Sequence, residues 1–286
     1  MYLIADSGST KCNWLLTNND GEQLGRYDTI GFNPLFQSSE DIALEIKQNE
    51  ALFAIAPQVQ KVYYYGAGVS SDAKARIVRR ALSHVFAGAE VITGHDLTAA
   101  AYASYNGSTC ICCILGTGSN SCLFDGNHLI EKVPSLGFIL GDEGSGAYFG
   151  KQLVSAYLYN KLPDDMVREL EKGYGLTKTD IFEAVYQKPR PNVYLARLAP
   201  FIHKHKHHPL LADILHKGFV AFITEHVLCY ENAKQLPVNF VGSIAHIFSN
   251  ELHKAAEECG ITIGEIVKQP IERLVKYHVE RVFNQE

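Results

Sequence analysis

The sequence predicts an α/β protein built from two related halves. Runs rich in β-branched and aromatic residues alternate with runs of helical periodicity along the chain. Two glycine-rich turns, at 6–11 and 116–120, each connect two predicted strands and so open two copies of one supersecondary unit. The 286 residues are 47% hydrophobic and 20% charged, which is typical of a globular chain long enough for two modest domains.

The first half is expected to begin with three strands joined by tight turns. The Asp20-Gly21 pair is a strong hairpin signal, because both residues tolerate a positive φ. The predicted strands of this half lie at 2–5, 12–17, 22–29, 59–65 and 90–93. Its predicted helices lie at 39–53, with Ser38 or Ser39 as N-cap, and at 72–86 and 96–104.

The second half is expected to repeat this order. Its predicted strands lie at 109–115, 121–124, 128–133, 238–241 and 261–267. A largely helical stretch is predicted from 145 to 232, then a helix at 245–259 and another at 270–283 with Pro270 at position N1. We therefore expect domains at 1–105 and 106–269, with the C-terminal helix, within 270–286, packing back on the first domain.

Charge and cysteine content narrow the classes of partner. A formal net charge of −5 argues against binding to nucleic acid or to an anionic membrane, since both require a basic face. The first six residues carry no basic region and no apolar run reaches 18 residues, so neither a signal peptide nor a membrane anchor is expected. Seven cysteines without a disulfide-like spacing favour reduced thiols in a cytoplasmic protein.

The two glycine-rich turns are the sharpest functional signal. Each lies between two strands, whereas dinucleotide-binding and P-loop motifs place their glycines at the start of a helix. Glycine lets the backbone approach a phosphate closely, while successive N–H groups and hydroxyls point toward it. Asp6, just before the first turn, could hold Mg²⁺. Either turn alone is also compatible with an ordinary hairpin.

Six motifs, taken in order, resemble those of the actin/hexokinase/heat-shock ATPase superfamily. Within it, the likeness is to the BadF/BadG/BcrA/BcrD ATPase family, which contains animal-type N-acetylglucosamine kinase, bacterial amino-sugar kinases and ATPase activators of 2-hydroxyacyl-CoA dehydratases. The motifs are Asp6-Ser7-Gly8-Ser9-Thr10-Lys11, Gly31-Phe32-Asn33-Pro34, Asp96, Gly116-Thr117-Gly118-Ser119-Asn120, Gly141-Asp142-Glu143-Gly144-Ser145 and Val241-Gly242-Ser243. The resemblance implies two ribonuclease H-like domains, each a mixed five-stranded sheet flanked by helices, with the active site in the interdomain cleft.

The resemblance also assigns roles to individual residues. Asp6 would serve Mg²⁺, and Asp96 would be the catalytic base that accepts the proton of the attacking hydroxyl. Asp96 could also cap the helix that it begins, a less favoured role that is compatible with the first. The residues expected to bind ATP are Ser9, Thr10, Lys11, Gly116, Thr117, Gly118, Gly242 and Ser243. The residues expected to bind the sugar are Asn33, Asn120, Asp142 and Glu143.

The implied function is an ATP-dependent sugar kinase that transfers the γ-phosphoryl group to an amino sugar, with the 6-hydroxyl of N-acetylglucosamine as the expected acceptor. Animal N-acetylglucosamine kinases carry Trp and His shortly before the Gly-Asp-Glu-Gly segment, where this chain has Leu136-Gly137-Phe138. Glucosamine, N-acetylmuramic acid and other amino sugars therefore stay open as substrates. A homodimer is also compatible with the resemblance.

Two alternatives come from other functional classes. A dehydratase activator would need cysteines at a dimer face, and the second half offers only Cys229 and Cys259 in helical, apolar surroundings. A nucleotide or sugar sensor that has lost the chemistry would not need to keep Asp6, Asp96 and Asp142.

Overall fold

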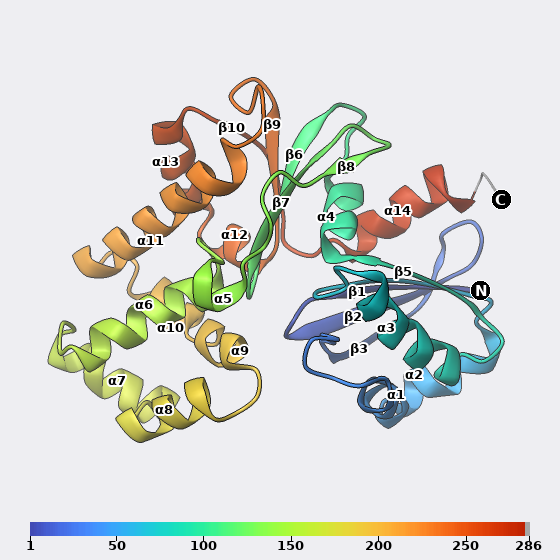
Figure 1. Ribbon diagram of the computed structural model, residues 1–286, viewed down its shortest axis with the longest axis horizontal. Coiled ribbons are helices and arrows are strands. Elements are labelled where there is room, and N and C mark those ends of the chain that lie inside the picture. Colours follow the sequence, from blue (N-terminus) through green and yellow to red (C-terminus); the bar gives the residue numbers. More distant parts are fainter. Residues whose placement is uncertain (284–286) are drawn as a thin grey trace. The chain divides into compact units, whose positions relative to one another are not determined.

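The computed structural model describes residues 1–283, and the chain divides into two compact units (Figure 1). The first unit comprises Met1–Gly107 together with the chain from Gln269, and the second comprises Ser108–Lys268. Each unit has one mixed five-stranded sheet with helices packed against it. The fold class predicted from the sequence is therefore confirmed.

The first sheet has the order β3-β2-β1-β4-β5. Its strands are β1 (Tyr2–Ser7), β2 (Lys11–Thr17), β3 (Gln23–Ile30), β4 (Lys61–Gly66) and β5 (Glu90–His95). β1 and β2 pair antiparallel, as do β2 and β3, whereas β1, β4 and β5 run parallel. The carboxyl ends of β1, β4 and β5 thus meet at one edge, the edge at which α/β sheets bind ligands.

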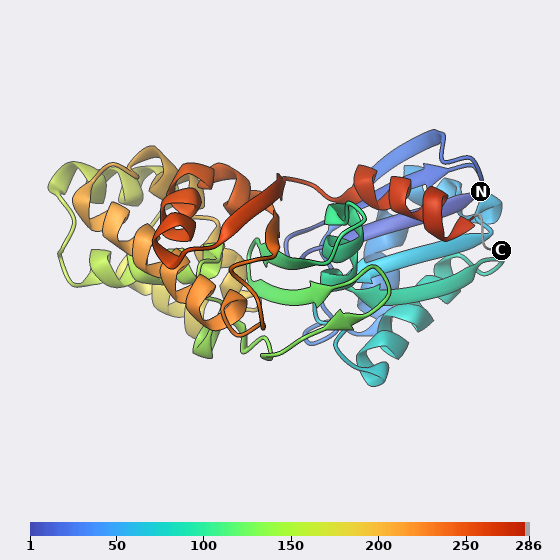
Figure 2. The same ribbon diagram turned by 90° about the horizontal axis from the view of Figure 1, so that it is seen from above.

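Helices cover both faces of this sheet (Figures 1 and 2). One face carries α1 (Ser39–Gln48), α2 (Glu50–Ala54), the short turn η1 (Ala56–Gln58) and α3 (Asp72–Val85). They close over a core that includes Trp14, Phe32 and Tyr64, all fully buried. The other face carries α4 (Asp96–Ser104) and α14 (Ile271–Arg281), which pack on Ile4 and Tyr63.

The second unit repeats the topology of the first. Its sheet, β8-β7-β6-β9-β10, has the same sequence of antiparallel and parallel pairings. The strands are β6 (Cys110–Leu115), β7 (Ser119–Phe124), β8 (Leu129–Ile130), β9 (Pro237–Val241) and β10 (Thr262–Val267). The helices are α5 (Gly137–Leu140), α6 (Gly146–Leu158), α7 (Asp164–Tyr174), α8 (Lys178–Tyr186), α9 (Pro191–Ala196), α10 (Ala199–Lys204), α11 (Pro209–Phe222), the π-helical turn η2 (Ile223–Val227), α12 (Ser243–Ile247) and α13 (Ser249–Cys259).

Several predicted elements have different bounds. The helix expected at 39–53 is interrupted at Asn49, whose side chain accepts a hydrogen bond from Leu52 N and so starts α2. The helix expected at 245–259 begins at Ser243 and is divided between α12 and α13. Pro270 is the N-cap of α14 rather than its first helical residue. The strand expected at 128–133 is only two residues long, and positions 284–286 of the C-terminal segment expected to pack on the first domain lie outside the described residues.

No helix among residues 1–283 is both long and apolar enough to cross a membrane. The seven cysteines are free thiols, and five of them are buried. Within the same residues, no group of three or more His, Cys, Asp and Glu side chains is arranged to hold a metal ion.

Candidate functional site

The first glycine-rich turn is held from behind by the Gly31-Phe32 segment. Gly31 N donates a hydrogen bond to Thr10 O at 3.0 Å, and Phe32 N donates to the buried Ser7 Oγ at 3.0 Å. A Cβ atom on Gly31 would lie 1.9 Å from Gly8 O, so only glycine allows this approach. The sequence motif around Gly31 therefore has a structural reason: it fixes the turn between β1 and β2.

The residues predicted to contact phosphate lie in or just after this turn. Thr10 and Lys11 are exposed, and Ser9 is partly buried. Lys11 Nζ forms an ion pair with Asp28 Oδ1 at 3.0 Å, with both side chains about half exposed at 48% and 49%. Exposed ion pairs contribute only about 0–1 kcal/mol. Lys11 can therefore exchange Asp28 for a phosphate oxygen at little cost.

Asp6 and Asp96 lie at the carboxyl edge of the first sheet. Asp6 is the next-to-last residue of β1, and Asp96 directly follows β5, with β4 between the two strands. Two strand spacings place the backbones of β1 and β5 about 10 Å apart. Burial, and then the charge of Asp96, raises the pKa of Asp6 to about 7. The two carboxylates therefore repel each other electrostatically across this edge.

A divalent cation suits this pair of acids. Carboxylate oxygens are the ligands that Mg²⁺ prefers, and a cation beside Asp6 would offset both its desolvation and its repulsion by Asp96. The donor chemistry of the site therefore fits the metal that the resemblance implies.

Asp96 is not the cap of its own helix. The N-cap of α4 is His95, whose Nδ1 accepts a hydrogen bond from Leu97 N at 3.2 Å, and Asp96 is the first helical residue. Asp96 Oδ1 lies 2.9 Å from the same Nδ1 but is buried without a hydrogen-bond partner among residues 1–283. The expectation that Asp96 could cap the helix is wrong because His95 fills that position. Its carboxylate oxygen keeps its capacity to accept a proton.

The side chain of Asn33 closes a turn through its oxygen, while its N–H group has no hydrogen-bond partner in the described chain. Its Oδ1 accepts a hydrogen bond from Leu35 N at 2.9 Å, which closes an Asx turn. The side chain packs closely on Gly68, where a Cβ atom would lie 2.3 Å from Asn33 Oδ1. Its Nδ2 group makes no hydrogen bond within the described chain, so an N–H donor stays available for a ligand.

The second glycine-rich turn rests on the first turn of α6. Gly116 O accepts a hydrogen bond from Gly146 N at 2.8 Å, and Thr117 O accepts one from Ala147 N at 3.0 Å. Two N–H groups in the first turn of α6, which have no partner within the helix, thereby make hydrogen bonds. The turn is thus fixed through its carbonyl groups, at the carboxyl edge of β6.

The predicted adenosine segment lies against the second turn. Gly242 follows β9, the parallel neighbour of β6, and has a φ of +126°. A Cβ atom there would lie 2.4 Å from Leu115 O and 3.3 Å from Gly116 N. Only glycine allows this contact, and the exposed Ser243 follows it at the start of α12.

Asp142 supports the second turn rather than projecting from it. The residue is buried, with a φ of +57°, and its Oδ1 accepts a hydrogen bond from Ser119 N at 3.3 Å. A Cβ atom on Gly118 would lie 3.0 Å from Asp142 Oδ2. The carboxylate therefore sits directly behind the backbone at Gly118 and Ser119.

Asn120 and Glu143 belong to polar contacts that the sequence did not reveal. Asn120 is buried, and its Nδ2 donates to Glu131 Oε2 at 3.5 Å. Glu143 Oε2 lies 3.5 Å from Nε2 of the buried His226. His226 lies within a long helical stretch and Glu131 follows a two-residue strand, so neither carries a local motif that could have identified it.

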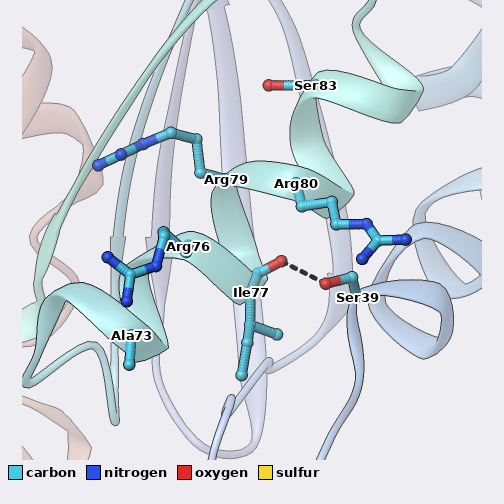
Figure 3. A pocket seen from close by; sticks show the side chains of 7 residues that line it. All are labelled: Ser39, Ala73, Arg76, Ile77, Arg79, Arg80 and Ser83. Carbon is cyan, nitrogen blue, oxygen red and sulfur yellow. Dashed lines mark hydrogen bonds between the residues drawn. The ribbon is translucent and has the colours of Figure 1, made fainter.

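A separate hollow of about 620 Å³ lies beside α3 and contains none of the predicted site residues. Its lining residues are Ser39, Ala73, Arg76, Ile77, Arg79, Arg80 and Ser83 (Figure 3). Arg80 pairs with Glu40 at 3.2 Å, and both side chains are largely exposed. We interpret this region as a solvated basic face rather than as part of the active site.

The comparison with solved structures decides the family. A proposed N-acetylglucosamine kinase from Porphyromonas gingivalis is 39% identical, with a TM-score of 0.91, over 98% of this chain and 99% of that one. The chain belongs to the N-acetylglucosamine kinase-like members of the BadF/BadG/BcrA/BcrD ATPase family. Scans against models of protein families and against curated proteins give no match.

Two further solved structures share the fold of this chain. A proposed N-acetylglucosamine kinase from Chromobacterium violaceum is 18% identical, with a TM-score of 0.70, over 96% of this chain and 98% of that one. A ROK family glucokinase from Streptomyces griseus, in complex with glucose and AMPPNP, is 15% identical, with a TM-score of 0.61. The match covers 96% of this chain and 97% of the glucokinase.

The segment before Gly141 presents aliphatic side chains to solvent. Phe138 packs against the core of the second unit, and its carbonyl accepts a hydrogen bond from Lys151 Nζ at 3.0 Å. Leu136, Ile139 and Leu140 are 56%, 71% and 75% exposed. The exposed surface of this segment is therefore aliphatic rather than aromatic or polar.

Proposed function

We propose that this protein is an ATP-dependent kinase that transfers the γ-phosphoryl group to a hydroxyl of an amino sugar, with the 6-hydroxyl of N-acetylglucosamine as the first candidate. The observation that carries the proposal is Asp96. Its carboxylate has a buried oxygen without a hydrogen-bond partner in the described chain, at the sheet edge that also holds Asp6. The 39% identity to the Porphyromonas gingivalis protein supports the same class of reaction.

The two glycine-rich turns would hold the nucleotide. The backbone N–H groups and hydroxyls of Ser9 and Thr10, with Lys11, are suited to the β- and γ-phosphates, and the turn at 116–118 would bind phosphate in the same way. Gly242 and Ser243 would lie against the adenosine. When bound at Asp6, Mg²⁺ would supply positive charge against the charge that develops on the transferring phosphoryl group.

Asp96 would act as the general base. Its carboxylate, which is 23% exposed, can accept the proton of the attacking sugar hydroxyl, which raises the nucleophilicity of the hydroxyl oxygen as the bond to phosphorus forms. Asn33 would offer its Nδ2 group to the sugar, with Asn120 and Glu143 as further contacts. Asp142 would contribute to the sugar site while it holds the second turn in place.

The test is a coupled ADP-release assay with ATP and Mg²⁺ on N-acetylglucosamine, glucosamine, N-acetylmuramic acid, glucose and water alone. We expect one amino sugar to give turnover well above water. Replacing the base, Asp96→Asn, should then lower kcat by about 10²- to 10⁴-fold with a small change in KM. Asp72→Asn is the matched control, because Asp72 is likewise the first residue of a helix, α3. Ordinary kcat in Asp96→Asn would exclude this residue as the base.

The same assay separates the other classes. Sugar-independent hydrolysis would favour a dehydratase activator, although burial raises the pKa of the Cys229 and Cys259 thiols, the opposite of what thiolate ligands of a cluster need. Binding of ATP and sugar without turnover would favour a sensor.

A further inference from the structure

His226 occupies an unusual position in the second unit. It lies in η2, the π-helical turn that continues α11, and such turns are frequent at functional sites. Its ring stacks on Phe222, with centroids 5.1 Å apart and planes 14° from parallel. Its carbonyl oxygen accepts a hydrogen bond from Ser121 Oγ at 2.5 Å, next to the predicted sugar ligand Asn120. Both backbone and ring are therefore fixed in place.

The fixed ring faces the predicted sugar ligand Glu143. His226 Nε2 lies 3.5 Å from Glu143 Oε2, and the side chains are 7% and 23% exposed. His226 Nδ1 is buried and has no hydrogen-bond partner among residues 1–283. A proton on Nε2 is therefore the arrangement that gives the ring a partner, because Nε2–H can donate to the carboxylate while Nδ1 keeps only a lone pair.

Glu143 itself is suited to bind a substrate. It belongs to the Gly141-Asp142-Glu143-Gly144 segment, and it is more exposed than His226. Tyr148 also lies within its electrostatic reach, since burial and then the charge of Glu143 raise the pKa of Tyr148. Holding Oε2 at His226 would leave Oε1 free to accept a hydrogen bond from a hydroxyl or amide N–H of the sugar.

We propose that His226 is a positioning residue for sugar binding: its Nε2–H orients the Glu143 carboxylate so that the free oxygen accepts a hydrogen bond from the amino sugar. This inference rests on the proposed kinase function. It adds a residue that no motif identifies, and it predicts an effect on sugar affinity rather than on the nucleotide or the chemical step.

The experiment compares wild type with His226→Phe and His226→Gln. Phenylalanine keeps the stack on Phe222 but removes the N–H donor, whereas glutamine keeps a donor. His216→Phe is the matched control, because His216 Nε2 also pairs with a glutamate, Glu258, at 3.0 Å, but on the exposed surface. The readouts are KM for the sugar, KM for ATP, kcat, calorimetric affinity for the sugar alone, and thermal unfolding to verify folding.

We expect His226→Phe to raise KM for the sugar, and the calorimetric dissociation constant, about 10-fold, the usual effect of losing a hydrogen bond to a charged group. KM for ATP and kcat should change less than about twofold. His226→Gln should recover most of the loss, and His216→Phe should match wild type.

Two results would overturn the inference in different ways. Unchanged sugar affinity in folded His226→Phe, or an equal loss in His226→Gln, would remove the positioning role and leave the kinase proposal intact. A wild-type protein that neither binds nor phosphorylates any amino sugar of the panel would overturn the kinase proposal and this inference with it. If His226→Phe does not fold, the sugar affinities of His226→Gln and His226→Asn are compared instead. A purely steric role of His226 would make the two variants bind the sugar equally weakly, and that result would contradict the positioning role.

Discussion

A missing side chain at Gly31 allows the first glycine-rich turn to exist in its present form. The Cα of Gly31 lies so close to Gly8 O that a methyl group would have to occupy the same space. The same logic applies at Gly242, which touches Leu115 O in the second unit. At both positions the backbone itself shapes the predicted phosphate or nucleoside site, so a substitution acts on function through geometry rather than through lost chemistry.

Gly31→Ala should destabilise the fold by about 1–3 kcal/mol, because the added methyl group must displace the turn. KM for ATP should rise as the turn moves, while KM for the sugar changes less. The measurements are urea unfolding and steady-state kinetics.

Gly88→Ala is the control for Gly31→Ala, since nothing lies within 4 Å of a Cβ atom at Gly88. It should stay within about 0.5 kcal/mol of wild type or be slightly more stable. Equal behaviour of the two variants would show that the close approach at Gly31 is not important.

A buried histidine adds a polar contact to the apolar packing of the last described helix, α14, on the first sheet. His278 is fully buried, and its Nδ1 must donate to Leu274 O at 2.8 Å because a carbonyl can only accept. In the neutral ring, which the lowered pKa of His278 favours near pH 7, Nε2 then accepts a hydrogen bond from Tyr65 OH at 2.9 Å. Burial lowers the pKa of His278 from 6.5 to about 4. The docking of α14 is thus tied to the neutral form of one side chain.

Stability should fall as the pH decreases from 6.5 to 4. The unfolded chain binds a proton at His278 below pH 6.5, while the folded chain does not until about pH 4, so acid favours unfolding. Protonation of His278 leaves the free energy of unfolding unchanged above pH 6.5 and lowers it by about 3 kcal/mol at pH 4. Thermal unfolding of wild type and His278→Leu between these pH values would measure it.

In His278→Leu, this part of the pH dependence should disappear. The matched control is His84→Leu, on the exposed side of α3, which should keep the wild-type slope. The same slope in all three proteins would contradict the assignment to His278.

At the scale of the whole molecule, the two units have separate cores. The large cluster around Phe149, Phe219 and Phe240 contains only residues of Ser108–Lys268, and the clusters around Trp14 and Tyr63 contain only residues of the first unit. The second unit is one continuous segment of chain, and the first unit is formed by two. The proposed base and metal ligand, Asp96 and Asp6, both belong to the first unit.

The segment 108–268, expressed alone, should fold and unfold cooperatively, because its core needs no residue from outside the segment. It should have no kinase activity, since Asp6 and Asp96 are absent. Circular dichroism during heating and the ADP-release assay are the measurements, with the full chain as reference. A segment that shows no cooperative transition would mean that the second unit depends on the first.

The sequence alone was sufficient for the features that depend on neighbouring residues. The two glycine-rich turns, the order of strands and helices and the repeated unit follow from turn chemistry and periodicity, which act over a few residues. The same dependence on neighbouring residues explains where prediction from the sequence failed. Whether Asn49 interrupts a helix, or whether His95 rather than Asp96 caps α4, depends on small differences between alternative local hydrogen bonds.

Only the tertiary structure decided which distant residues meet. The contact of Gly31 with Gly8, the support of the second turn by Asp142 and the pairing of His226 with Glu143 each join separate elements. No periodicity encodes such contacts, because they exist only after strands and helices have packed. The sequence by itself therefore determined the architecture and the motifs, whereas the packed chain decided how each motif is held, since side-chain contacts between elements depend on the whole fold.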